Sequence, residues 1–323
     1  MIRRMSVTCL LALALQYAAS PASAQDYPNK TIRIIVTTSA GGISDIFTRA
    51  VAEPLHARLG QPVIIENRPG GNMIIGARAC AEAAPDGYTL CVMPGEPLTY
   101  NQFQFKSIPY DPDKSFQPIT NFFFITQALG VSTKLGVKNL AELAAYSKAH
   151  AGTLSYSAPS SSLQVFMETW KQQTGADLVK VPFKGGGDTV NGILSGTTPV
   201  GFLGLGNFIA HIRAGTVTAI LADGEKRSPL ISDVQTLSEI GLARDHTRAF
   251  FGLLAPAGTP RPIVDKLRAE IVRIVNDPTF TDRHLVQRGL APVLNTPEEF
   301  RDFLIADRAR AQKIVKAAGL EPR

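Results

Sequence analysis

The stretch NFFFITQALGV, residues 121–131, decides how this chain of 323 residues is organised. It has the pattern of a long apolar strand, and a second such strand, FFGLLAPAGTP, occupies residues 250–260. Strand-like and helical patterns alternate between the two, so the intervening segment is a self-contained α/β block. Two long strands that bracket such a block predict a chain that crosses into a second domain and returns. We therefore expect a discontinuous first lobe, residues 25–127 plus 250–323, and a second lobe at residues 128–249.

The rest of the chain repeats this alternation of strand and helix. Helical spacing of apolar residues begins at Ile46, Leu140 and Ile263, and we expect Pro54 to kink or interrupt the first of these helices. Strand-like runs separate the helical patterns: TIRIIVT, QPVIIEN, YTLCVM, TLSYSA, LVKVPF, TPVGFLGL, TVTAILA and LAPVLN. Strands that alternate with helices favour βαβ units, which predicts the α/β class with mixed, mostly parallel sheets flanked by helices.

The first 24 residues have the pattern of a secretory signal peptide. Arg3 and Arg4 precede an apolar core, and residues 22–24 are small, as cleavage requires. No later stretch approaches the roughly 18 apolar residues that a membrane span needs. Removal of residues 1–24 leaves 299 residues and lowers the formal charge from +6 to +4. We expect a periplasmic protein, and the dispersed basic residues do not indicate nucleic-acid binding.

Cys80 and Cys91 are the two cysteines outside the signal peptide. Cys80 lies on a helical pattern and Cys91 on the strand-like run that follows. Export permits a disulfide between them. Two cysteines where a helix packs on a sheet are also typical of buried apolar residues, and we favour unpaired cysteines. The histidines share no close spacing, so no metal site is predicted.

The loop TTSAGGISD, residues 37–45, lies between the first strand and the first helix. A dinucleotide-binding loop needs G-x-G-x-x-G, and this loop has only two adjacent glycines. A nucleophile elbow needs G-x-S-x-G around Ser44, which is absent, so no catalytic residue is predicted. Small residues at a helix start leave backbone N–H groups accessible. This favours an anion site for a carboxylate at Ser39, Ala40, Gly41 and Gly42.

A second loop has the same design. It follows the run LSYSA and consists of Pro159, Ser160, Ser161 and Ser162, before a helix that begins near Leu163. Three hydroxyls at a helix start offer donors to an anion, although a serine-rich cap and turn would explain one such loop alone. Because the two loops fall on different lobes, we expect them to hold one ligand from opposite sides.

Longer motifs cover nearly the whole chain from Tyr27 to about Gly319. They are YPNKTIRIIV, LGQPVIIENRPGG, AAPDGYTL, VPFKG, HIRAG, EKRSP, FFGLLAPAGTP and TPEEF. With these motifs the chain resembles the Bug-type periplasmic solute receptors of tripartite tricarboxylate transporters. The resemblance implies a two-lobe periplasmic-binding-protein fold, type II-like, with a small carboxylate in the cleft between the lobes. It also implies that residues 39–42, Ser44 and Asp45 form one side of the ligand site, and residues 160–162 the other.

The chain departs from the family pattern at several expected cleft positions. Ser39 and Ala40 stand where two prolines are common, and Gln164 stands near a usual histidine. Leu203 and Gly204 stand where the family strand commonly ends in Asp-Asn, which implies that Leu203 replaces an aspartate facing the cleft. We therefore expect a less polar ligand, such as an aromatic or aliphatic acid. Glu96, after YTLCVM, should also face the cleft, where a solvated loop acid is the simpler interpretation.

The resemblance also implies how the protein works. It predicts a monomer that binds its ligand without cofactor or metal and performs no chemistry. Ligand binding would close the lobes about hinges near Gln127–Gly130 and Thr247–Gly252. The expected partner is the membrane permease of a tripartite tricarboxylate transporter. The alternative is a sensory receptor that presents its ligand to the extracytoplasmic domain of a sensor kinase.

Overall fold

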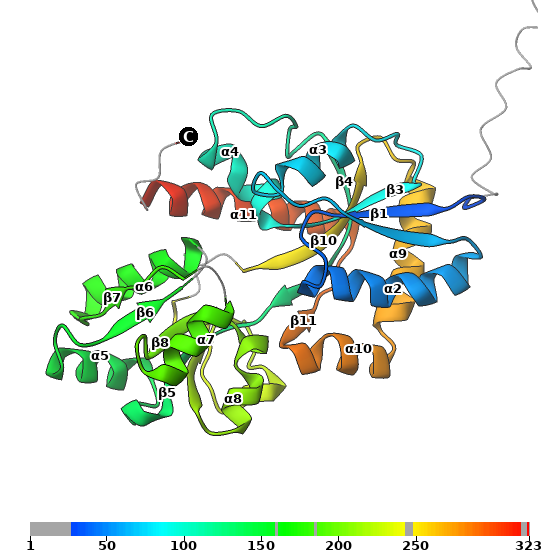
Figure 1. Ribbon diagram of the computed structural model, residues 1–323. Helices are drawn as coiled ribbons and strands as arrows, with labels where there is room; N and C mark the ends of the chain where they lie inside the picture. Colours follow the sequence, from blue (N-terminus) through cyan, green and yellow to red (C-terminus); the bar gives the residue numbers. More distant parts are fainter. Residues whose placement is uncertain (1–26, 159–160, 184–185, 243–247, 318–321, 323) are drawn as a thin grey trace, which may run out of the picture.

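The computed structural model describes residues 27–158, 161–183, 186–242, 248–317 and 322. The predicted signal peptide, residues 1–24, lies outside them. Figure 1 shows two lobes, each built on its own sheet and flanked by its own helices. None of the described helices is long and apolar enough to cross a membrane.

Lobe 1 contains a six-stranded sheet in the order β11-β4-β10-β3-β1-β2. Its strands are β1 (Ile32–Val36), β2 (Val63–Asn67), β3 (Thr89–Pro94), β4 (Phe116–Ile125), β10 (Phe250–Pro256) and β11 (Leu290–Pro292). Its helices are α2 (Ile43–Leu59), α3 (Ile74–Ala81), α4 (Asn101–Gln104), α9 (Arg261–Val275), α10 (Pro278–His284) and α11 (Pro297–Ala317).

Lobe 2 contains a five-stranded sheet in the order β7-β6-β8-β5-β9. Its strands are β5 (Gln127–Ser132), β6 (Ser155–Ser157), β7 (Val179–Lys180), β8 (Val200–Gly204) and β9 (Val217–Ala222). Its helices are α5 (Leu140–Ala149), α6 (Ser161–Thr174), α7 (Gly186–Ser195) and α8 (Ile209–Arg213).

The strands that enter and leave each lobe explain why both sheets are mixed. β10 runs antiparallel to β3 and β4, and β5 runs antiparallel to β8 and β9. Among the described strands, the parallel pairs are β1 with its neighbours β2 and β3, and β6 with β7 and β8. Two mixed sheets flanked by helices confirm the predicted two-lobe α/β fold, although parallel pairs do not dominate as expected, because the crossing strands run against their neighbours.

The stretch 121–131 is not one strand, because it divides at Thr126 between the two sheets. The N–H of Thr126 donates to the carbonyl of Gly289, at 3.0 Å. One residue later, the N–H of Gln127 donates to Oδ1 of Asp223, which follows β9, at 2.7 Å. The N–H of Ile125 also donates to the carbonyl of Ala249, just before β10, at 2.8 Å, so the outgoing and returning segments are hydrogen-bonded to each other between the lobes.

Alternating side chains of β1 build two separate cores in lobe 1. Ile34 and Val36 pack in one cluster with Phe47 of α2. Ile35, which lies between them, packs on the opposite face with Ala77 of α3. Packing on both faces of β1 fixes the start of α2 relative to the end of β1, and the loop 37–45 lies between them.

Helix α2 continues through Pro54, so the expectation that this proline interrupts the helix is wrong. Val51 and Leu55, on either side of it in the sequence, are buried against the sheet. Their packing stabilises the helix enough to offset the hydrogen bond that proline cannot donate.

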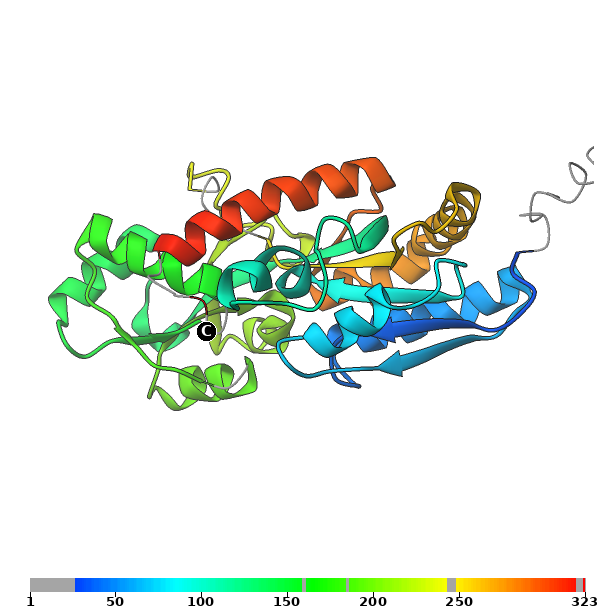
Figure 2. The same ribbon diagram turned by 90° about the horizontal axis from the view of Figure 1, so that it is seen from above.

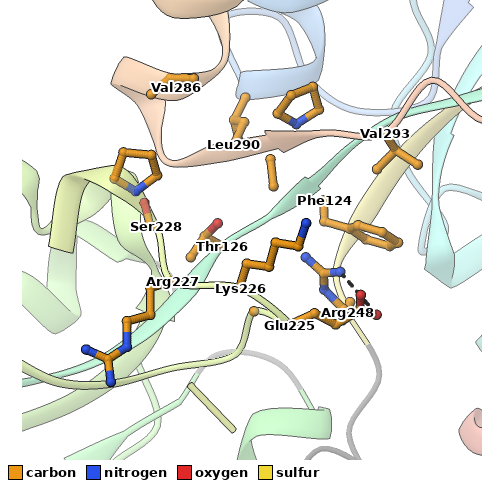
Figure 3. Close-up of a pocket in the computed structure, with 14 residues that line it drawn as sticks. Phe124, Thr126, Glu225, Lys226, Arg227, Ser228, Arg248, Val286, Leu290 and Val293 are labelled. Atoms are coloured by element: carbon orange, nitrogen blue, oxygen red, sulfur yellow. Dashed lines mark ion pairs between the residues drawn. The ribbon is translucent and has the colours of Figure 1, made fainter. Parts of the chain in front are cut away.

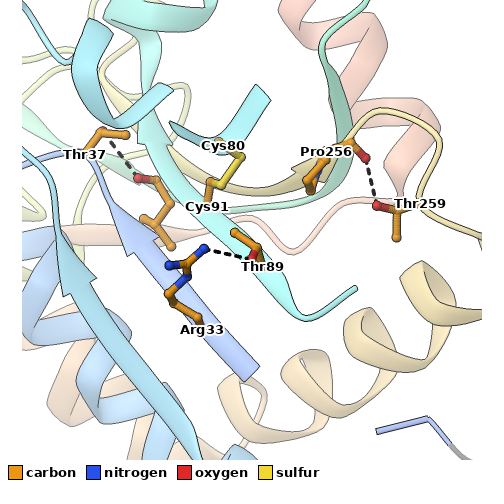
Figure 4. The surroundings of a disulfide bond; sticks show 8 residues. Arg33, Thr37, Cys80, Thr89, Cys91, Pro256 and Thr259 are labelled. Carbon is orange, nitrogen blue, oxygen red and sulfur yellow. Dashed lines mark hydrogen bonds between the residues drawn. A yellow bond between two sulfur atoms is a disulfide. The ribbon is translucent and has the colours of Figure 1, made fainter. Parts of the chain in front are cut away.

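The two cysteines outside the predicted signal peptide form a disulfide, so the prediction of unpaired cysteines is wrong. Cys80 of α3 and Cys91 of β3 are bonded, with their Cα atoms 6.2 Å apart. Figure 4 shows the bond joining helix to strand. Both residues are fully buried, as the sequence pattern indicates. Burial alone does not distinguish a free thiol from a disulfide. The position in which α3 packs on β3 decides it, because it brings the two Cα atoms within the range that a disulfide spans.

The C-terminal helix α11 starts on lobe 1 and contacts lobe 2. A capping box starts this helix: the N–H of Thr296 donates to Oε2 of Glu299 at 2.8 Å, and the N–H of Glu299 donates to Oγ1 of Thr296 at 3.1 Å. Farther along, α11 contacts α6 of lobe 2, and Figure 2 shows the end of α11 beside α6. This contact links the lobes in addition to the two crossing segments.

Candidate functional site

The loop between β1 and α2 presents backbone rather than side chains. Residues 39–43 are exposed, and α2 begins on the side of lobe 1 that faces lobe 2 (Figure 1). Gly41 has φ +80°, a conformation that residues with a Cβ rarely adopt. Gly42 is the N-cap of α2, and no side chain caps the helix there. The first N–H groups of a helix have no intrahelical acceptor, so this end can receive an anion.

Asp45 holds this loop in shape from inside. Its Oδ2 accepts the N–H of Gly41 at 2.8 Å, and its Oδ1 accepts Nε of Arg49 at 3.0 Å. Burial by itself would raise the pKa of Asp45, but hydrogen bonds from Arg49, Gly41 and Asn67, with the charge of Arg49, outweigh it and lower the pKa. Asp45 is therefore a buried carboxylate whose bonds are directed into the protein, and the N–H of Gly41 is already engaged.

Ser44 is buried as well. Its Oγ lies 2.6 Å from Oγ1 of Thr38, across the loop. Asn67 at the end of β2 completes the frame, because its Nδ2 donates to the carbonyl of Thr38 at 3.1 Å and its Oδ1 accepts from Arg49 at 3.0 Å. The predicted residues of this loop thus divide into an exposed set, residues 39–42, and a buried pair that positions it.

The second predicted loop is only partly described. Ser160 lies outside the described residues, and Ser161 and Ser162 are the first residues of α6, although their side chains are not described. Gln164 lies in the first turn of α6 and donates from Nε2 to the carbonyl of Ala158 at 2.9 Å. Its side chain therefore ties α6 to the preceding segment.

Leu203 does not lie where the family pattern implies. It is 2% exposed and packs in a core cluster with Val190 and Ile193 of α7. Gly204, the last residue of β8, is partly exposed, and its carbonyl accepts Nδ2 of Asn207 at 2.9 Å. The structure thus removes the reason for expecting a less polar ligand, because Leu203 faces the interior of lobe 2.

The structure adds a feature that sequence reasoning missed at the start of α7. Asn207 is exposed and lies against Gly186, where a Cβ would come within 2.6 Å of the Asn207 side-chain oxygen. Gly186 and Gly187 open α7 much as Gly41 and Gly42 precede α2. The adjacent glycines were the sequence signal for this exposed helix start. The contact of Asn207 with Gly186 was not readable, because it depends on how the chain turns after Gly204.

Glu96 differs from a solvated loop acid. It follows β3 and is the first residue of a π-helical segment, Glu96–Tyr100. The residue is only partly exposed. Burial raises its pKa, a backbone hydrogen bond opposes the shift, and the charge of Asp307 adds to it. Glu96 therefore has a greater tendency to hold a proton than an ordinary glutamate.

Among the described residues, no three His, Cys, Asp or Glu side chains gather as metal ligands would. The described residues instead present exposed backbone at the start of one helix in each lobe, α2 in lobe 1 and α7 in lobe 2, with buried side chains behind it. Backbone N–H groups at a helix start are able to receive an anion.

Comparison with known proteins identifies the family. A model of the tripartite tricarboxylate transporter family receptor matches residues 47–320. BugT of Bordetella pertussis is 30% identical over 323 residues, covering 98% of this chain and 99% of BugT. The solved structure of a periplasmic transporter is 36% identical with a TM-score of 0.75, and the match covers 91% of this chain and 99% of the transporter chain.

Two solved structures contain named acids. Rpa4515 of Rhodopseudomonas palustris, solved with adipate, is 26% identical with a TM-score of 0.76, covering 92% of this chain and all of its own. MatC of the same organism, with bound malate, is 28% identical with a TM-score of 0.70, covering 90% of this chain and all of its own. The family consists of periplasmic solute-binding receptors. With this coverage, the resemblance drawn from the motifs is confirmed, and the chain belongs to the receptor family of the tripartite tricarboxylate transporters.

Proposed function

We propose that this protein is a periplasmic receptor that binds a small carboxylate between its lobes and delivers it to a tripartite tricarboxylate permease. The observation that carries the proposal is the start of α2, where residues 39–42 are exposed and a hydrogen-bonded set of Asp45, Arg49 and Asn67 supports the loop. A prearranged backbone site binds an anion with little loss of entropy on binding. The adipate and malate bound by Rpa4515 and MatC support a carboxylate as the guest.

The roles of the predicted residues follow from their environments. Backbone groups of residues 39–42, apart from the N–H of Gly41, contact one carboxylate, and Ser44 and Asp45 position the loop. Residues 160–162, Gln164 and Gly204 belong to the opposite side, in lobe 2. Leu203 lies behind this surface and not on it, so the ligand class includes dicarboxylates as well as monocarboxylates.

Ligand binding acts by favouring closure of the two lobes about a hinge. A ligand that contacts both lobes only when they are closed shifts the equilibrium toward that form by its difference in affinity for the two. The outgoing segment at Gln127 and the returning segment at Ala249 provide the hinge, and the N–H of Ile125 donates to the carbonyl of Ala249 at 2.8 Å. The permease then recognises the closed receptor. In this proposal the protein acts as a monomer, uses no cofactor and performs no chemistry.

A thermal-shift panel of adipate, malate, citrate and benzoate, followed by calorimetry, tests the ligand class. An acid at about a hundredfold excess over its Kd should add about 2.7 kcal/mol of stability. In a Gly42→Val variant the side chain covers the start of α2, and binding should weaken at least tenfold. Ala145→Val, on the exposed surface of α5, is the matched control and should bind as the unmodified protein does. Equal binding by both variants would place the ligand elsewhere and reject this site.

A further inference from the structure

A separate cavity lies beside the hinge and contains none of the residues assigned to the ligand site. It has a volume of about 440 Å³ and is open to solvent. One wall comes from lobe 1, including Phe124, Leu290 and Val293, and the other from the segment after β9 in lobe 2, including Lys226. Figure 3 shows these residues around the cavity, with Lys226 and Arg248 directed into the space below β11.

Arg248 is a largely buried cation, and the charges of two carboxylates, Asp223 and Glu225, act on it. Its NH1 lies 3.9 Å from Oε1 of Glu225, a long contact to a side chain that is 79% exposed. The guanidinium carbon lies 3.8 Å from the centre of the Phe124 ring. Its Nε is buried and has no hydrogen-bond partner among the described residues. The Arg248 side chain is 17% exposed and lines the cavity, so a ligand there can accept from the accessible part of its guanidinium.

The neighbouring cations behave differently from one another. Arg227 is already engaged, because its Nε donates to both carboxylate oxygens of Glu239 at 2.9 and 3.0 Å. Lys226 is exposed and forms no ion pair with any described residue. Lys226 and Arg248 are thus the two cations at this cavity that remain able to receive an anion.

The remaining wall of the cavity is apolar and favours a ligand with an apolar body. Val286, Leu290 and Val293 contribute aliphatic surface, and Phe124 contributes an aromatic ring. A hydrated inorganic anion would gain nothing from such surface, whereas an apolar body attached to a carboxylate would be removed from water.

We propose that this cavity is a second binding site, specific for a small organic acid with one carboxylate and an apolar body. Arg248 and Lys226 receive the carboxylate, and the β11 wall contacts the apolar part. The site is independent of the cleft at the start of α2, and the proposal does not depend on the identity of the ligand bound there.

Calorimetric titration of the mature protein with benzoate and with hexanoate tests this site, using benzyl alcohol as a neutral probe. Gly42→Val is used as the background, so that binding in the cleft is suppressed. We expect saturable binding of benzoate or hexanoate with a Kd of about 1 mM or tighter, and none of benzyl alcohol. Arg248→Gln and Lys226→Gln should each weaken binding about tenfold or more, since each removes a charge-assisted contact.

A matched variant distinguishes this site from a general attraction of anions to positive charge. Arg227→Gln serves this purpose, because Arg227 lines the same cavity but is held by Glu239, and it should bind within about twofold of the background protein. Lys226 is exposed, so its variant tests the proposal even if Arg248→Gln is unstable. Absence of saturable binding of both acids overturns the proposal. Equal weakening by Arg227→Gln and Lys226→Gln also overturns it, because binding would then follow net charge alone.

Discussion

Gly41 shows how one residue shapes the proposed ligand site. Its φ of +80° turns the chain so that the next residue can start α2, and its N–H is held by Asp45. No atom outside the loop lies within 4 Å of a Cβ built at this position. The requirement for glycine is therefore one of backbone conformation and not of space.

The substitution Gly41→Ala should lower the free energy of unfolding by about 1–2 kcal/mol, because alanine in the left-handed region is strained. Gly42→Ala is the matched control, since Gly42 has φ −75° and a Cβ would make only an ordinary 3.4 Å contact with the carbonyl of Ser39. Urea denaturation at neutral pH measures both. A loss at Gly42 as large as that at Gly41 would contradict the role of backbone conformation.

Glu96 predicts a dependence of stability on pH. Because its pKa is raised in the folded protein, the native state binds more protons than the unfolded state between the ordinary glutamate pKa and the raised native value. Its contribution is therefore most favourable at low pH and declines as pH rises through this window. Glu96→Gln lacks this decline and should be more stable than the unmodified protein at pH 7, with the difference shrinking toward pH 4.

Unfolding curves measured across this pH range for both proteins provide the check. Asp302→Asn is a suitable control, because Asp302 is an exposed acid on α11. A difference between Glu96→Gln and the unmodified protein that stays constant with pH would show that the substitution acts through packing and not through the proton.

At the scale of elements, the Cys80–Cys91 disulfide fastens α3 to β3. The bond closes a short loop, with a sequence separation of 11 residues. On the face of the sheet that α3 covers, Ile35, Met93 and Phe250 belong to the same core cluster as both cysteines. The bond thus lies within a packed core and adds to stability mainly by restricting the unfolded chain.

Replacing both cysteines by alanine should lower the free energy of unfolding by about 3 kcal/mol, from the loop-closure entropy of a loop of this size. Adding reductant to the double variant should change nothing further, while adding it to the unmodified protein should reproduce most of the loss. Mass measurement after alkylation counts the free thiols in each sample. Two alkylated cysteines in the untreated protein would refute the bond.

At the scale of the whole molecule, the lobes meet closely at the hinge. A Cβ at Gly206 of lobe 2 would come within 2.7 Å of the carbonyl of Arg288 in lobe 1, and a Cβ at Gly289 within 3.0 Å of the N–H nitrogen of Gly206. Two stretches of backbone therefore touch without side chains between them. Glycine at these positions permits the present angle between the lobes.

The substitution Gly206→Ala should force the lobes apart, since the opposing atom is backbone and cannot rotate away. Small-angle X-ray scattering of the ligand-free protein should show a larger radius of gyration, and affinity for the cleft ligand should fall. Ala145→Val, on the exposed surface of α5, is the control, because it adds bulk away from the contact between the lobes. An unchanged scattering profile for Gly206→Ala would show that the hinge absorbs the methyl group without opening.

The sequence by itself determined the class of fold, the family and the position of the exposed glycine loop. These follow from patterns along the chain: the period of apolar residues, the longer motifs, and small residues before a helix. Such patterns depend on neighbours along the chain, which the sequence displays directly.

Only the tertiary structure decided the Cys80–Cys91 bond, the inward direction of Leu203 and the pairing of Arg248 with Phe124. Each depends on the register and angle at which separate elements pack, and a shift of one residue along a strand would reverse which face Leu203 occupies. The burial of Cys80 was readable from its apolar helix face, but its distance from Cys91 was not. Local pattern fixes what an element is, whereas the contacts between elements depend on how all of them fill one core together.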